Sequence, residues 1–171
     1  MRYALYLVLS LIAHGIAFAL SPVLPWFAEQ RLGALNNASL LGVGPRLPIW
    51  LAWFDTPDNS LDGDSRFLKL NGRGYWQKVR WLYRNRVYGF NWTVLSAKVE
   101  KERTVTGDPN IGYQGSRFGT LKIAQPNGAW QYKIVTPLFG RVFEGNFGWL
   151  LDDTSKQRAL FMFSPRIKKA S

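Results

Sequence analysis

Cysteine is absent from this chain of 171 residues, and histidine occurs once, at position 14. The lack of cysteine excludes a disulfide framework, a thiolate metal centre and a cysteine nucleophile. A Ser-His-Asp triad is not expected either, because His14 lies in an apolar segment. Acidic residues are also scarce, since 11 Asp and Glu accompany 22 Lys and Arg and leave a net charge of +11. This excess favours anionic partners such as lipid headgroups, nucleic acid or an acidic protein.

Apolar and aromatic residues, in contrast, are plentiful. Hydrophobic residues make up 47% of the chain and aromatic residues 15%. That share supports a packed core and excludes a wholly disordered chain. The length suits one domain of ordinary size.

Residues 3–28 form an apolar run whose strongly polar side chains are Ser10, His14 and Ser21. At about 1.5 Å per helical residue, the run exceeds the roughly 30 Å hydrocarbon core of a bilayer. Aromatic residues lie near both ends, as is common in helices that cross membranes. Pro22 predicts that the regular helix ends near Leu20. We predict a membrane anchor in residues 1–31, with His14 bonded within a helix interface.

Two other interpretations of this run stay open. A cleaved signal peptide fits Arg2, the apolar centre and the small-residue triplet at 17–19. An in-plane or core helix should show a polar face, and the sequence shows none. After the run, residues 32–48 carry Gly, Pro and Asn without a sustained period and are predicted to be a linker. Residues 49–171 are predicted to form a single domain.

The predicted domain opens with an apolar aromatic stretch at residues 49–54. Trp50, Trp53 and Phe54 either pack into the core or face a membrane or a partner protein. A helix is predicted over 74–84, because apolar residues recur there at helical spacing. Its outward face carries Lys78, Arg80 and Arg84. Basic residues between aromatic ones are also typical of a nucleic-acid surface. We favour an ordinary amphipathic helix, because such helices commonly carry Arg on the outer face and Trp on the inner face.

Four aspartates between positions 55 and 64 form an acidic loop. Oxygen ligands beside Gly63 are compatible with calcium, and Asp58 and Asp62 are the candidate ligands. An EF-hand is excluded, because the twelfth position falls on Lys69 where a bidentate Glu is required. A turn in which the aspartates bond local backbone N–H groups explains the same residues. We therefore predict no metal site and no cofactor.

From residue 90 onward the apolar period changes to two. Asn127-Gly128 lies between two alternating segments, which is a strong hairpin signal. A second hairpin is predicted between 141–153 and 158–167. We expect an α+β fold in which about five antiparallel strands within 90–167 form a meander, closed as a barrel or stacked as a sandwich. The short helix should pack on this sheet.

Several stretches resemble an uncharacterised family of tailed-phage membrane-associated proteins. They follow an apolar N-terminus with a basic second residue and read LPIWLAWFDTPDNSLDGD, YWQKVRWLYRNRVYGF, EGNFGWLL and FMFSPR. The resemblance touches most of the chain outside the linker and implies no known activity or catalytic residue. It implies a phage-encoded protein that works at or near the host membrane.

Together these observations predict a non-enzymatic interaction protein anchored in the host inner membrane. Its partners would be the lipid bilayer and a host or phage protein. The anionic cytoplasmic leaflet favours a basic domain on that side. A nucleic-acid-binding module is the first alternative. A hydrolase is the second, in which Asp58 or Asp62 would act with Glu100 or Glu102.

Overall fold

The computed structural model describes residues 2–32, 43–111, 118–152 and 157–169. Two compact units divide the chain, Met1–Val94 as unit 1 and Leu95–Ser171 as unit 2. The fold is mixed α+β, as predicted: an N-terminal apolar helix and short helices make up much of unit 1, and antiparallel strands dominate unit 2. The division between the units falls after Val94, within the region 49–171 for which the sequence predicted a single domain.

Unit 1 begins with α1 (Arg2–Leu20), which ends just before Pro22, as predicted. The 3-10 turn η1 (Leu24–Phe27) follows. Next, β1 (Glu29–Leu32) and β2 (Val43–Arg46) pair as antiparallel strands. Of the predicted linker 32–48, residue 32 and residues 43–46 therefore lie in paired strands. Residues 33–42, its middle part, lie outside the described residues.

Four short helical elements complete unit 1: η2 (Ile49–Phe54), α3 (Ser65–Asn71), α4 (Tyr75–Asn85) and α5 (Tyr88–Thr93). The Asp64 side chain caps α3 by accepting the Phe67 N–H at 2.7 Å. Helix α4 confirms the prediction for 74–84. The strand expected from residue 90 is wrong at its start, because residues 88–93 are helical.

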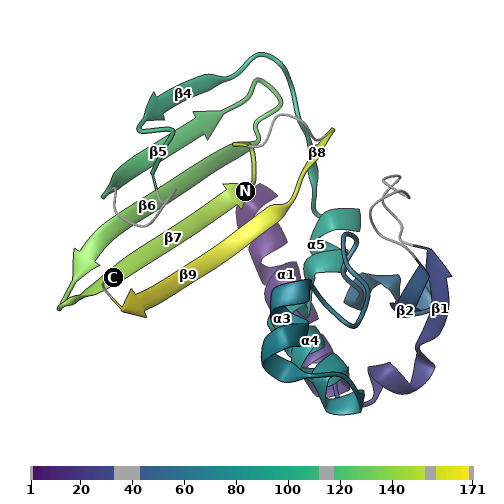
Figure 1. The fold of residues 1–171 in the computed structure, drawn as a ribbon. Coiled ribbons are helices and arrows are strands. Elements are labelled where there is room, and N and C mark those ends of the chain that lie inside the picture. The colour runs from purple at the N-terminus through teal and green to yellow at the C-terminus, as the bar shows by residue number, and fades with distance from the viewer. Residues whose placement is uncertain (1, 33–42, 112–117, 153–156, 170–171) are drawn as a thin grey trace. The chain divides into compact units, whose positions relative to one another are not determined.

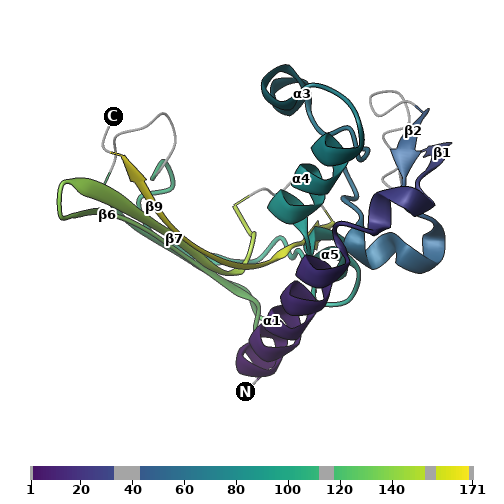
Figure 2. The same cartoon turned by 90° about the horizontal axis from the view of Figure 1, so that it is seen from below.

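Two apolar clusters of described residues lie in the core of unit 1. Five buried leucines from η1, η2, α4 and the intervening loops form the first: Leu24, Leu47, Leu51, Leu61 and Leu82. The second joins α1 to the α4–α5 junction through Ala13, Ala17 and Val87. Figure 2 shows α1 running beside α4 and α5, with which it is in contact. Helix α1 is thus an integral part of unit 1.

Unit 2 is a meander of five strands in the spatial order β4-β5-β6-β7-β9 (Figure 1). Their bounds are β4 Thr104–Gly107, β5 Gly119–Ala124, β6 Trp130–Leu138, β7 Arg141–Trp149 and β9 Phe161–Lys169. All four pairings are antiparallel, and Asn127-Gly128 forms the turn from β5 to β6 as predicted. The sheet stays open with β4 and β9 as edges, so the described strands do not close the expected barrel.

A two-stranded pairing and a buried glutamine stabilise the region where β7 ends and β9 begins. Strands β3 (Ala97–Lys98) and β8 (Arg158–Ala159) pair antiparallel. The Trp149 indole donates to the Leu95 carbonyl at 2.8 Å, and its ring meets Phe161 edge-on. The fully buried Gln131 side chain accepts two backbone N–H groups from residues 151 and 152. These bonds satisfy the backbone where β7 ends.

Candidate functional site

One narrow face of α1 is docked on the rest of unit 1. Ser10 donates from Oγ to Asn91 Oδ1 in α5 at 3.0 Å, and both side chains are buried. Small side chains at Ala13 and Ala17 let the helices approach, since neither protrudes from α1. His14 Nδ1 lies 2.8 Å from the carbonyl oxygen of Ser10, which is one turn earlier in α1, so this contact lies within α1 itself.

The remaining surface of α1 exposes large apolar side chains. Within the described residues, α1 is the one helix long and apolar enough to cross a membrane. Its exposed large apolar residues are Leu5, Val8, Leu9, Leu11, Ile12, Ile16, Phe18 and Leu20. Such a concentration is unusual for a surface that faces water, because monomeric proteins seldom expose large contiguous apolar patches.

Aromatic side chains of η1 and η2 are exposed as well. Trp26 is 74% exposed and Trp50 71%. Phe27 of η1 packs edge-on against Trp50 of η2, with ring centroids 5.8 Å apart. Trp53 is also exposed and meets Phe90, whereas Phe54 is half-buried against the core. The structure thus places Trp50 and Trp53 outward and Phe54 inward. We call the exposed apolar residues of α1, η1 and η2 the apolar surface.

The basic residues predicted on α4 are engaged to different degrees. Lys78 Nζ lies 3.1 Å from Asp62 Oδ1, and Arg84 Nη1 lies 3.6 Å from Asp64 Oδ2. Arg84 also lies over the Trp81 ring at 5.3 Å. Arg80 is exposed. The acidic loop therefore neutralises part of this basic face.

Each aspartate of the acidic loop has a structural partner of its own. Asp55 is buried beside Arg46 and accepts the N–H groups of Leu47 and Thr56. Asp58 accepts the Tyr88 hydroxyl at 3.1 Å. Burial raises the pKa of Tyr88 far above its ordinary value, and the nearby Asp58 carboxylate raises it further.

These separate roles do not assemble a metal centre. In the described ranges, no group of three or more His, Asp or Glu side chains is arranged to hold a metal ion. Asp58 contacts Tyr88 while Asp62 contacts Lys78, so the two candidate ligands have different partners. The loop instead connects η2 to α3 and α4 through hydrogen bonds and ion pairs.

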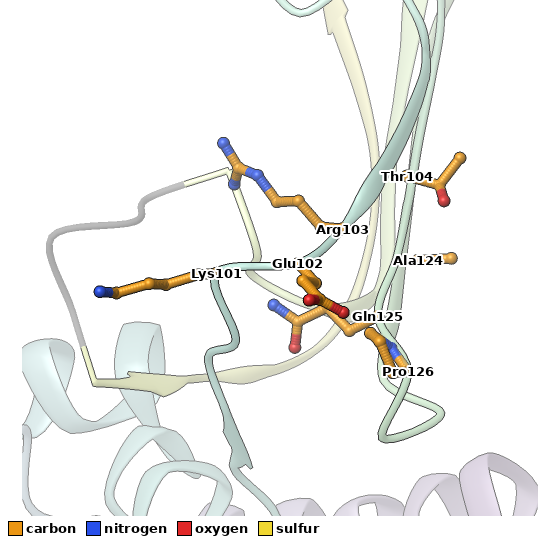
Figure 3. Close-up of a pocket in the computed structure, with 7 residues that line it drawn as sticks. All are labelled: Lys101, Glu102, Arg103, Thr104, Ala124, Gln125 and Pro126. Atoms are coloured by element: carbon orange, nitrogen blue, oxygen red, sulfur yellow. The ribbon is translucent and has the colours of Figure 1, made fainter.

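The carboxylates proposed for hydrolysis fall in separate units, with Asp58 and Asp62 in unit 1 and Glu100 and Glu102 in unit 2. Glu102 lines a shallow depression of about 640 Å³ (Figure 3). Its lining residues are Lys101, Glu102, Arg103, Thr104, Ala124, Gln125 and Pro126. Glu102 is the one carboxylate among them, and glycoside hydrolysis normally uses two facing carboxyl groups.

Sequence reasoning missed the Ser10–Asn91 contact and the buried Arg46–Asp55 pair. A signal for the first was present, because Ser10, Ala13 and Ala17 recur at helical spacing in an otherwise bulky apolar run. The second gave no signal. Arg46 lies in a stretch with the composition of a loop, and its burial depends on β2 pairing with β1.

The fold and this surface define an α+β protein with an N-terminal apolar helix docked on its own unit. The chain belongs to a family of unknown function, DUF7338, which matches residues 1–170. Searches of curated proteins and of solved structures gave no match. Membership of an uncharacterised family is thereby confirmed, while the phage origin stays a prediction.

Proposed function

We propose that this protein is a non-enzymatic membrane-anchored interaction protein, with α1 as its anchor. The observation that carries the proposal is the apolar surface, which combines the outer side of α1 with the exposed tryptophans of η1 and η2. Fully burying one Leu, Ile or Phe side chain contributes about 1.5–3 kcal/mol. Lipid contact by several of these residues at once is therefore strongly favourable.

The docking of α1 supports a retained anchor rather than a cleaved signal peptide. Ala17 and Ser10 are each 1% exposed, so removing α1 would uncover the side chains that they cover. Asn91 would lose its buried hydrogen-bond partner on α1. A helix that completes the core of the mature unit is costly to remove, whereas a signal peptide has no such role.

Tryptophan placement and charge are consistent with an interfacial position. Trp26 and Trp50 present amphipathic rings of the kind that concentrate at the level of lipid headgroups. The net charge of +11 favours anionic lipid, at about 1 kcal/mol for each basic residue near the surface. We extend the proposal to a phage-encoded protein on the cytoplasmic side of the host inner membrane, with a host or phage protein as its further partner.

Of the alternatives, a nucleic-acid module receives less support. Two of the three basic residues predicted for that surface, Lys78 and Arg84, lie within ion-pair distance of aspartates. Phosphate binding would have to displace those carboxylates. The depression beside Glu102 offers a single carboxylate, so it gives a hydrolase little support.

Replacing Leu11 and Ile12 by arginine tests the anchor directly. Both side chains are more than half exposed, so the substitutions leave the core of unit 1 intact. Each arginine at the centre of an inserted helix costs about 2.5–3.5 kcal/mol on insertion scales. We expect the double variant to move from the membrane pellet to the supernatant after cell fractionation, with an unchanged circular dichroism spectrum.

The matched control places the same two charges on exposed positions of α3. Ser65→Arg with Leu70→Arg should leave the protein in the membrane pellet, since neither residue belongs to the apolar surface. Intact-mass measurement of the pelleted protein should show that α1 is retained. If the Leu11 and Ile12 double variant still sediments with membranes, the anchor lies elsewhere and the proposal is wrong.

A further inference from the structure

The turn between β6 and β7 combines two unfavourable features in one residue. Phe139 and Gly140 form a two-residue hairpin loop between the paired residues Leu138 and Arg141. Phe139 has a φ of 47°, and it is the one non-glycine residue with a positive φ among those described. Its side chain is 98% exposed. The ring thus buries almost nothing, and the backbone holds a conformation that suits Asn or Gly.

The surroundings of Phe139 are apolar at the turn and basic just behind it. Pro137 is exposed and Leu138 half-buried at the end of β6, and Ile167 of β9 is 58% exposed. The register aligns Leu138, Arg141 and Lys169 across the three strands, with Lys168 in the adjacent row. The acidic residue in this region, Glu144, forms an ion pair with Lys168. The exposed phenyl ring of Phe139 therefore lies next to the basic residues Arg141, Lys168 and Lys169.

We propose that the β6–β7 turn is a second membrane contact, in which Phe139 inserts into the interface of an anionic bilayer. This inference rests on the proposed function, because it assumes that the protein works at a membrane. Phe139 and the neighbouring Leu138 would enter the boundary between headgroups and acyl chains. Arg141 and Lys169 would remain level with the lipid phosphates, since basic side chains can keep their charge in water while their stems cover apolar surface.

Lipid explains the composition of this turn better than a base-stacking partner does. A single-stranded nucleic acid could stack a base on the Phe139 ring and bind the basic residues through its phosphates. It has no apolar region that would cover Pro137, Leu138 and Ile167. A bilayer accommodates the aromatic ring, the aliphatic side chains and the cations at successive depths. The strain at Phe139 also has an explanation, because unfavourable local conformations tend to persist at functional sites.

The absence of cysteine makes a site-specific test simple. In the full chain, Phe139→Cys can be labelled with an environment-sensitive nitrobenzoxadiazole dye and mixed with phosphatidylcholine–phosphatidylglycerol vesicles. We expect a blue shift with higher emission, and quenching by spin-labelled acyl chains. The matched control is Pro126→Cys in the β5–β6 turn, at the opposite end of β6. A dye at position 126 should keep the emission it has in water.

A second variant separates insertion from folding. Phe139→Asn places a residue that tolerates positive φ in the turn, so the melting temperature of unit 2 should rise by a few degrees. The same change should lower affinity for the anionic vesicles several-fold. This is best measured in the Leu11→Arg/Ile12→Arg background, where α1 no longer dominates binding. Phe139→Leu retains apolar bulk and should keep most of the affinity.

The possible results distinguish the two proposals. If the chain binds vesicles while the dye at 139 remains in water, the turn inference is wrong and the α1 anchor stands. An affinity that is unchanged by Phe139→Asn also overturns the inference. If the unaltered chain binds no vesicles, the proposed function itself fails. Quenching at position 139 by nucleic acid, with none by lipid, would assign the turn to the other partner class.

Discussion

Arg46 and Asp55 form a buried ion pair in unit 1. Their side chains are 1% and 5% exposed, and Arg46 Nη1 lies 3.8 Å from Asp55 Oδ2. Arg46 also donates to the Thr56 carbonyl at 2.9 Å. Both charged groups are buried away from water, so the stability of each in the folded state depends on the partner groups that the fold provides. The pair links β2 to the end of η2.

Removal of the Asp55 carboxylate should therefore strongly destabilise unit 1. We expect Asp55→Ala to lower the free energy of unfolding of unit 1 by about 3–5 kcal/mol, because Arg46 would stay buried without its counter-charge. Urea unfolding followed by tryptophan fluorescence measures the change. Asp62→Ala is the control, since its ion pair with Lys78 is partly exposed and should contribute about 0–1 kcal/mol. Equal losses in the two variants would contradict the argument.

Tyr88 gives unit 1 a specific response to alkaline pH. Burial raises its pKa, followed in importance by the Asp58 carboxylate and the hydrogen bond to it. An unfolded tyrosine titrates near pH 10, so the folded state holds the proton more tightly than the unfolded state does. The stabilisation is fully present below about pH 10 and is lost as the pH rises towards the folded-state pKa.

The raised pKa of Tyr88 predicts that the unfolding free energy of unit 1 depends on pH in the alkaline range, and that this dependence comes from the Tyr88 hydroxyl. Above pH 10, the unfolding free energy of unit 1 should fall by up to about 1.4 kcal/mol per pH unit from Tyr88 alone. Tyr88→Phe should remove that contribution, which is measured by urea unfolding between neutral pH and about pH 11. Tyr83→Phe serves as the control and should retain the steeper slope. Parallel curves for the two variants would show that the Tyr88 proton is not linked to folding.

At the scale of elements, the close contact between α5 and η2 explains why residues 88–93 are helical. A Cβ atom on Gly89 would lie 2.3 Å from the Ala52 carbonyl oxygen and 2.5 Å from that of Asp55. Only glycine allows this approach. The alternation of Phe90 and Trp92 suggested a strand, but Val87 and Asn91, four residues apart, both face α1. Tertiary contacts outweighed the local pattern.

The α1–α5 contact also makes a prediction about the membrane-bound state. Ser10 and Asn91 are joined by a buried hydrogen bond, so cysteines at these positions should react with a short thiol-to-thiol cross-linker. We expect cross-linking in membranes as well as in detergent, because α1 stays docked while its outer side meets lipid. Gel mobility measures it. Leu11→Cys with Asn91→Cys is the control, since Leu11 is exposed. Loss of the Ser10 cross-link in membranes would mean that α1 leaves α5 to cross the bilayer alone.

For the whole molecule, the two units carry different parts of the proposed role. Unit 1 holds the apolar surface and the hydrogen bonds that organise the acidic loop. Unit 2 is an open meander whose β6–β7 turn presents Phe139. Under the proposed function, each unit would contact a bilayer through its own exposed side chains, and the variants above test the two contacts separately.

Local patterns in the sequence were enough for several features. The apolar run and Pro22 predicted α1 and its end, helical spacing predicted α4, and Asn127-Gly128 predicted the β5–β6 turn. Each of these depends on residues within a few positions of one another, where propensity and periodicity act directly. Net charge and the lack of cysteine also limit the chemistry open to the chain, because both are properties of composition that folding does not change.

Tertiary structure alone decided which side chains are covered. It buried Arg46 beside Asp55, turned Trp50 outward and Phe54 inward, and paired the two ends of the expected linker. It also left Phe139 exposed at a positive φ. The exposure of a side chain depends on contacts between residues far apart in the chain. The same apolar residue type can lie in a core or on a surface, so its identity alone does not decide its exposure. The candidate site could therefore be recognised only in the folded structure, which shows which apolar residues are buried in the core and which are exposed.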